Sequence, residues 1–366
     1  MKRHFTPVII LLACSESSTL KEQYDAQDMT IEMEQDANNN QKTDSNIEDS
    51  LKGIIYFSAR TINDNYNGIY QFDLHTKKVQ ELTDKTGAII TFEENAQIKS
   101  PTFSQDHTKL IYEKKTPSTD NIELYDLATG ELQIITQAKG YTSFAWQDES
   151  TIFFSEQSRK DNHFSTSIYK VDINNISLVE VLNMPLHDFR MNIDILQQEN
   201  LLAFDCVPPQ NLVNAAQNPD YSNTNEINYP RTLCTSQIPS SGRLNFLNNG
   251  NQTPELELVG LPIKWDDGGS INKIIGVYTP CKRTNENKHR LCAMDYTRTG
   301  SLFEVPLPEE YDITQFSISK DHNVILNLDY IWNRTENKFI PTGFKEGTQI
   351  GNKQIRNPII IDGILE

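Results

Sequence analysis

Long hydrophobic runs are absent from this chain of 366 residues. The apolar segment from Val8 to Ala13, with Phe5 before it, is far shorter than the roughly 20 residues that cross a bilayer as a helix. No later segment is long enough either. The sequence therefore excludes a permanent transmembrane helix.

Positive charge is scarce as well. The chain has 33 Lys and Arg against 50 Asp and Glu, for a formal net charge of -17. Such a chain would repel phosphate backbones and anionic lipid surfaces. We expect no nucleic-acid partner, and we interpret the acidic balance as a solvated surface. A hydrophobic content of 37% is enough for a packed core.

The linear motifs of catalysis are also missing. The chain contains no Gly-x-Ser-x-Gly elbow, no His-Glu-x-x-His, no phosphate-binding Gly-x-x-x-x-Gly-Lys-Ser/Thr and no EF-hand loop. Its seven His are scattered, and His289 near Cys292 does not form a metal site as an isolated pair. We interpret Asp266 to Gly269 as an acidic turn between strands. The sequence predicts no metal, no cofactor and no nameable catalytic residue.

The amino terminus carries a recognisable pattern. Lys2 and Arg3 precede the short apolar segment, which closes on Leu11-Leu-Ala-Cys14. This arrangement is typical of a signal peptide, and its ending resembles the lipobox of bacterial lipoproteins. The resemblance implies that residues 1–14 form the signal, that lipid on Cys14 anchors the protein to a membrane, and that the protein resides in a bacterial cell envelope. The residue after Cys14 is Ser15. An Asp at this position would favour retention in the inner membrane, so Ser15 favours sorting to the outer membrane.

Residues 15–50 have the composition of a tether. They include ten Asp or Glu, two Lys, no Gly and no Pro. Too few apolar residues are present to form a core, so we expect disorder. A random coil of this length spans on the order of 30 Å, and repulsion between its charges extends it further. We therefore expect residues 51–366 to form the folded domain.

An internal repeat organises that domain. Short β-rich runs alternate with polar turns, and one type of strand recurs in a common frame. The five copies are Gly68 to Leu74, Asn121 to Leu127, Ser167 to Ile173, Thr232 to Ile238 and Arg290 to Tyr296. The sixth position of the frame holds Asp73, Asp126, Asp172, Gln237 and Asp295. A carboxylate there can accept hydrogen bonds from the following turn, so we expect a structural role for it.

Each copy lies among other strand-like runs, which gives four strands per unit and predicts an all-β fold, the β-propeller. A degenerate last unit runs from Glu310 to about Gly343 and brings the count to six blades, with seven as the alternative. The first unit lacks an innermost strand. The apolar segment from Asn357 to Ile361 is predicted to fill that place, because a closed ring leaves no exposed sheet edge.

One unit resembles a known repeat. Phe103 to Tyr112, followed by Thr129-Gly130, resembles the repeat of the TolB-like six-bladed propellers, with weaker likenesses at Trp146-Gln-Asp148 and Ser319-Lys-Asp321-His322. The family's Ser-Pro-Asp-Gly turn is altered here, since Gln105 replaces Pro and His107 replaces Gly. The resemblance spans most of residues 53–343. It implies a fold and an envelope setting but no particular partner.

The longest predicted loop indicates a ligand face. Residues Val207 to Leu233 join a second strand to a third, and long loops on a rigid scaffold often carry function. We expect Asp220, Tyr221, Tyr229 and Arg231 to contribute to this face.

These features favour a protein-binding or scaffolding module. The alternative is a propeller enzyme, a hydrolase or lyase acting on envelope carbohydrate or peptide, because active sites in this fold are assembled from separate blades. A structural spacer is a third hypothesis. Carboxylates or His converging at the channel mouth would favour the enzyme, and an aromatic-rimmed patch would favour binding.

Four Cys remain after lipidation of Cys14. An even number in an exported protein predicts disulfides, and three connectivities are possible. Cys234 and Cys292 occupy the same frame position, while Cys206 and Cys281 each follow the preceding apolar strand. Neighbouring antiparallel strands bring such positions within bonding reach. The alignment therefore predicts Cys206 with Cys234 and Cys281 with Cys292.

Overall fold

The chain divides into a segment of residues 1–46 and a compact unit of residues 47–366. A computed structural model describes residues 52–365 of the compact unit, except for the positions 62–63, 91, 93–95, 141, 161–162, 186–191, 207–231, 239–244, 250–255, 259–263, 267–275, 284–287, 296–301, 306, 308–310, 320–321, 346 and 351–352.

The described strands form six antiparallel sheets. The first contains β25 (Gln349–Ile350), β26 (Lys353–Leu365), β1 (Gly53–Thr61), β2 (Asp64–Asp73) and β3 (Lys78–Glu81). The second contains β4 (Gln97–Phe103), β5 (Lys109–Lys115), β6 (Asp120–Asp126) and β7 (Leu132–Gln137). The third contains β8 (Thr142–Trp146), β9 (Thr151–Lys160), β10 (His163–Asp172) and β11 (Ser177–Pro185).

The remaining three sheets follow in chain order. The fourth contains β12 (Ile193–Leu196), β13 (Leu201–Cys206), β14 (Thr232–Gln237) and β15 (Asn245–Asn249). The fifth contains β16 (Leu256–Leu258), β17 (Lys264–Asp266), β18 (Gly276–Arg283), β19 (His289–Asp295) and β20 (Leu302–Glu304). The sixth contains β21 (Phe316–Ile318), β22 (Val324–Leu326), β23 (Tyr330–Asn333) and β24 (Lys338–Pro341).

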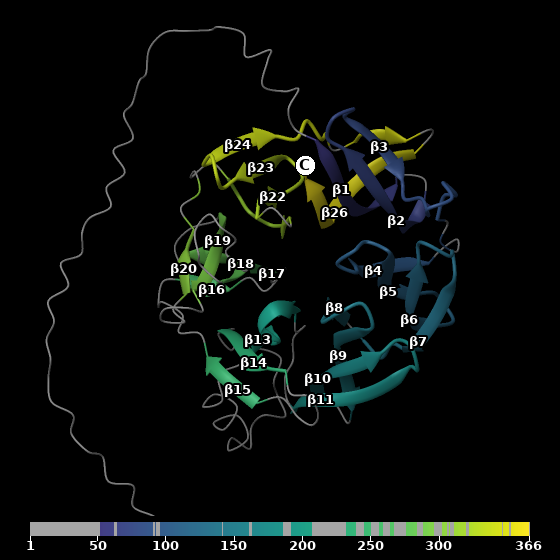
Figure 1. Cartoon of the computed structure of the whole chain (residues 1–366), viewed down its shortest axis with the longest axis vertical. Helices are drawn as coiled ribbons and strands as arrows, with labels where there is room; N and C mark the ends of the chain where they lie inside the picture. The colour runs from purple at the N-terminus through teal and green to yellow at the C-terminus, as the bar shows by residue number, and fades with distance from the viewer. Residues whose placement is uncertain are drawn as a thin grey trace, which may run out of the picture. The chain divides into compact units, whose positions relative to one another are not determined.

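The six sheets are arranged as a ring. One strand of each sheet lies against its counterpart in the next sheet, in the closed series β26, β4, β8, β12, β17, β21 and back to β26. Figure 1 shows the sheets radiating from this inner ring. This arrangement confirms the predicted all-β propeller.

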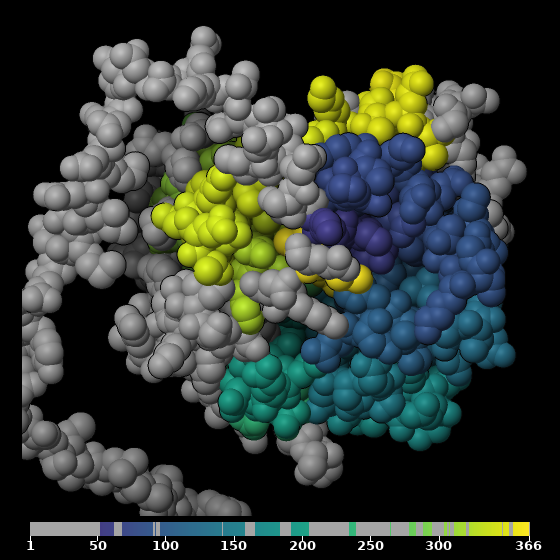
Figure 2. Space-filling model, turned by 45° about the horizontal axis from the view of Figure 1, so that its top comes forward, coloured from purple at the N-terminus to yellow at the C-terminus, as the bar shows by residue number. Residues whose placement is uncertain are grey.

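The carboxyl-terminal strand closes the ring. β26 pairs with β1 from Gly53 opposite Leu365 to Thr61 opposite Ile355, so the two ends of the propeller share one sheet. In Figure 2 the purple residues of β1 lie against the orange-yellow residues of the carboxyl-terminal end. The prediction that Asn357 to Ile361 supplies the missing innermost strand is confirmed, and the observed strand extends beyond that segment at both ends.

The core lies between neighbouring sheets. Apolar side chains of the second sheet, such as Ile111 and Ile122, pack against Phe144 and Phe154 of the third. Because the hydrophobic effect stabilises each such contact by about 25 cal/mol per Å² of buried apolar area, the face-to-face packing of sheets holds the ring together.

The last unit begins with a shorter strand than the sequence predicts. The pattern of residues from Asp312 to Ser319 favours a strand over that whole range, but β21 covers only Phe316–Ile318. The backbone N–H groups of Thr314 and Gln315 donate to Asn327 Oδ1, at 3.1 and 3.0 Å. These groups are satisfied by a side chain, so they do not extend the strand ladder.

Candidate functional site

The recurring aspartates have a structural role. Asp73, Asp126 and Asp172 each accept hydrogen bonds from backbone N–H groups two or three residues later, at 2.8–2.9 Å. Gln237 donates instead to the carbonyl oxygen of Glu199 at 2.9 Å. The expected turn-capping role is confirmed for these three carboxylates, and the side chain of Asp295 lies outside the described residues.

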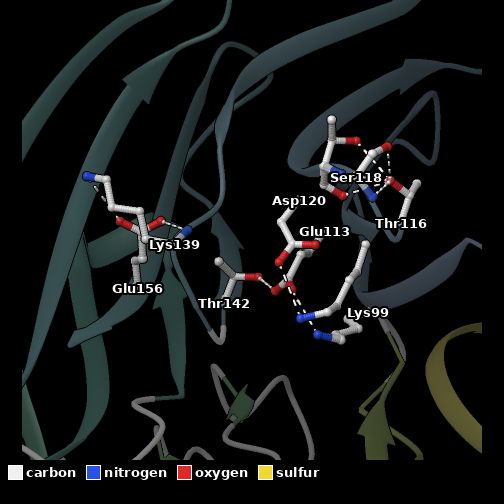
Figure 3. A network of polar contacts seen from close by, with 10 residues as sticks. Lys99, Glu113, Thr116, Ser118, Asp120, Lys139, Thr142 and Glu156 are labelled. Carbon is white, nitrogen blue, oxygen red and sulfur yellow. Dashed lines mark hydrogen bonds and ion pairs between the residues drawn. The ribbon is translucent and has the colours of Figure 1, made fainter.

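Buried carboxylates join the second and third sheets (Figure 3). The side chain of Glu113 on β5 is 2% exposed, and it forms an ion pair with Lys99 Nζ at 3.0 Å. Its other oxygen accepts a hydrogen bond from the hydroxyl of Thr142 on β8, at 2.7 Å. The hydrogen bond from Thr142 therefore links the second sheet to the third, whereas the ion pair lies within the second sheet.

Glu156 on β9 is the second member of this network. It accepts the backbone N–H of Lys139 at 2.8 Å, and the Lys139 ammonium lies 3.8 Å away. Burial raises the pKa of Glu156, and the nearby charge of Glu113 adds to the rise. Neither glutamate lines a described cavity, and both have protein partners. We assign them to blade-to-blade packing.

A cavity lies at one mouth of the central channel. Its volume is about 430 Å³, within the usual range for ligand pockets. Four sheets contribute to it, through the β4–β5 turn, the β12–β13 turn, the β21–β22 turn and β26. The lining residues are Phe103, Ser104, Gln105, His107, Ile195, Leu196, Gln197, Gln198, Ile318, Ser319, His322, Asp362 and Gly363.

An imidazole and a carboxylate meet in this cavity. His107 Nε2 lies 3.1 Å from Asp362 Oδ2, and Asp362 Oδ1 accepts the N–H of Gly363 at 2.8 Å. The His107 ring is also flanked by the rings of Tyr56 and Phe103, at centroid distances of 5.6 and 5.5 Å. The His107 ring and the Asp362 carboxylate are therefore fixed before any ligand arrives.

The turn that carries His107 is itself tightly held. Partial burial acts to raise the pKa of Asp106, but hydrogen bonds from Ser104 and Thr108 outweigh it and lower the pKa to about 2. His107 has a φ of 56°, in the left-handed region that the related motif fills with Gly. His322 has a φ of 62° at the equivalent place of the last unit.

The comparisons with known proteins concern the fold. No protein-family model and no curated protein sequence matches the chain. Among solved structures, TolB from Acinetobacter baumannii is similar with a TM-score of 0.50 and 13% identity, over 85% of this chain and 67% of that one. The chain has a TolB-like fold.

Two further structures are similar at lower TM-scores. Oligogalacturonate lyase from Vibrio parahaemolyticus has a TM-score of 0.49 and 13% identity, over 79% of this chain and 78% of that one. The propeller domain of the Trilobed protease from Pyrococcus furiosus has a TM-score of 0.44 and 14% identity, over 75% and 74%. At such low identities a shared fold does not assign an activity, a ligand or a partner to this chain.

One predicted disulfide is present. Cys281 and Cys292 are bonded, with Cα atoms 5.7 Å apart, and both lie within strands, β18 and β19, rather than beyond them. Cys281 lies opposite Arg290, two residues before Cys292. Cys206 has the same relation to Cys234, because it lies opposite Thr232.

The second pairing stays a prediction. Cys234 is disulfide-bonded, but the side chain of Cys206 lies outside the described residues. The predicted ligand-face residues Asp220, Tyr221, Tyr229 and Arg231 also lie outside them, as does Cys14.

The described part of the chain has neither a metal-binding cluster nor a membrane-spanning helix. Within the described ranges, no three His, Cys, Asp or Glu side chains are placed to hold a metal ion. Over those ranges no helix has the length and hydropathy to cross a bilayer.

The sequence did not predict the channel-mouth cavity. The histidines are scattered along the sequence, yet His107 and His322 line one cavity together with Asp362. A signal was present, because both histidines stand at the Gly position of the same turn motif in two units.

Proposed function

We propose that this chain is a lipid-anchored envelope protein whose six-bladed propeller binds a partner protein at the channel mouth. The observation that supports this function is the cavity of about 430 Å³ contributed by four sheets. Five of its lining residues carry neutral amide or hydroxyl groups, namely Ser104, Gln105, Gln197, Gln198 and Ser319. Such groups form hydrogen bonds with a ligand without transferring protons, which suits recognition.

Photo-crosslinking in the native host tests this function. A photoreactive amino acid replaces Gln198, which is exposed and lines the cavity, in the full-length chain. We expect a discrete protein adduct after irradiation. The matched control places the same group at the exposed Ser118, in the β5–β6 turn at the opposite end of its sheet. Adducts from Ser118 alone, or from neither position, would contradict binding at this mouth.

A hydrolase or lyase acting on envelope carbohydrate or peptide is the second candidate. The meeting of His107, His322 and Asp362 in one cavity favours it, since acid–base catalysis needs such groups within reach of a substrate. The His107→Asn variant separates the two functions, because Asn tolerates the left-handed backbone. Turnover of envelope material by the wild type that is lost in this variant would support the enzyme and count against a pure binding role.

A further inference from the structure

The chemistry of the cavity indicates what kind of group it accepts. Its walls include the apolar side chains of Phe103, Ile195, Leu196 and Ile318. Asp362 is the only carboxylate among its lining residues. Apolar walls with a single carboxylate match a side chain that has an apolar stem and a cationic head.

The Asp362 carboxylate is ready to pair with a cation. One oxygen lies 3.1 Å from His107 Nε2 and the other accepts the Gly363 N–H. A carboxylate has about four lone-pair positions, so two partners leave room for a third donor. Its side chain is 29% exposed, which leaves it accessible from the cavity. Burial raises the pKa of Tyr56, and the negative charge of Asp362 raises it further.

Three of the turns at this end of the propeller carry negative charge. Asp106, Asp148, Glu149 and Glu199 are exposed residues of the β4–β5, β8–β9 and β12–β13 turns. Lys109 is the one Lys or Arg within or next to the described residues of these three turns. The net charge of the whole chain is -17, to which residues 1–14 contribute +2 and residues 15–50 contribute -8. Residues 51–366 therefore carry a net charge of -11. Such a field attracts cationic partners and repels anionic ones.

We propose that the channel mouth accepts a lysine or arginine side chain from a basic segment of a partner protein, with Asp362 as the pairing carboxylate. The stem of that side chain lies against Ile195, Leu196 and Ile318. The acidic turns increase the rate of encounter, and Asp362 determines how long the complex lasts. This inference rests on the proposed binding function and names the chemistry of its partner.

Three pentapeptides that differ only at the central residue serve as probes. They carry arginine, its neutral isostere citrulline, or glutamate. Each is titrated into the full chain with isotope-labelled isoleucine and leucine methyl groups, in about 0.15 M salt, where the Debye length is about 8 Å. We expect the arginine peptide to shift the methyl signals of Ile195 and Ile318, and to bind at least about tenfold more tightly than the citrulline peptide.

Two variants locate the effect. Asp362→Asn keeps the shape of the side chain and should weaken arginine binding by about tenfold or more. Glu199→Gln removes the same charge from a turn at the rim, outside the lining of the cavity, and should weaken binding by about threefold or less. An unchanged melting temperature in both variants confirms that they fold.

Several results would overturn the inference. They are equal affinity for arginine and citrulline, full affinity in Asp362→Asn, or no methyl shift with any peptide. If these occur while the crosslink from Gln198 persists, the binding function stands and only the basic ligand is wrong. If that crosslink is also absent, the proposed function fails with it.

Discussion

At the scale of single residues, the carboxylates of this protein serve three different purposes. Asp73, Asp126 and Asp172 cap turns at strand ends. Glu113 is buried, forms an ion pair within its blade and accepts a hydrogen bond from the next blade, and Asp362 faces a cavity. The residue type is the same, but burial and partners decide the role.

The first prediction concerns Asp106 and the dependence of stability on pH. Its pKa is about 2 in the folded protein against an ordinary 3.8, so the unfolded chain takes up a proton at a higher pH. The stability that Asp106 contributes is therefore present above about pH 4 and lost as the pH falls towards 2. We expect Asp106→Asn to lose about 1 kcal/mol at pH 7, after discounting for exposure, and to show a shallower loss at acid pH. Urea unfolding from pH 2 to 7 measures both, and a profile parallel to the wild type would contradict this role.

The second prediction concerns the contribution of Glu113 to the free energy of unfolding. Glu113→Ala leaves the Thr142 hydroxyl and the Lys99 ammonium without their carboxylate, which should lower the free energy of unfolding by about 3 kcal/mol. The matched control is Lys115→Ala in the same strand, whose 3.3 Å pair with Asp120 is exposed and worth less than about 1 kcal/mol. Equal losses in the two variants, measured by chemical denaturation, would refute the blade-joining role.

At the scale of elements, two strand pairs carry cysteines in the same register. In each pair, one Cys lies opposite a residue that stands two positions before the second Cys. The bonded pair Cys281–Cys292 shows that this register permits a disulfide. The repeat alignment predicted this geometry, because equivalent positions of a repeated unit have equivalent neighbours.

The third prediction concerns these disulfides. Removing Cys281–Cys292 by a double Ala substitution should cost about 2–3 kcal/mol, because the bond closes a short loop and limits the unfolded chain. Non-reducing peptide mapping of the exported protein should recover this bond and a Cys206–Cys234 peptide. A peptide that joins Cys206 to Cys281 or Cys292 would refute the shared register.

At the scale of the whole molecule, closure of the ring depends on β26. This strand joins β1 in one sheet and contacts β4 and β21 on either side. Without it, β1 would present an unpaired sheet edge, which invites aggregation. The last strand of the chain therefore completes the first blade.

Truncation tests that closure and gives the fourth prediction. A chain that ends at residue 352 should lose its cooperative unfolding transition and aggregate, since the core around Ile355 and Ile361 is removed with the strand. The matched control deletes residues 1–50, which precede the propeller, and should keep the melting temperature of the full chain. A cooperative transition in the carboxyl-terminal truncation, measured by circular dichroism, would show that closure is dispensable.

Lipid attachment gives the fifth prediction, also for the whole molecule. Cys14→Ser should move the protein from the membrane fraction to the soluble fraction of its host, because no segment of the sequence is long enough to span a bilayer. Immunoblotting of the two fractions measures this. Continued tight membrane association of the variant would contradict lipid anchoring.

The sequence by itself determined the propeller. The strand frame, its turn-capping Asp residues and the Cys281–Cys292 bond follow from local patterns that repeat along the chain, and the closing strand follows from the strand that the first unit lacks. Only the tertiary structure decided the candidate site, because residues separated by as many as 255 positions, such as His107 and Asp362, meet only when the ring closes. A repeat specifies the neighbours within a blade, whereas a channel mouth is lined by one turn from each of several blades, and no local pattern records which side chains face one another across it.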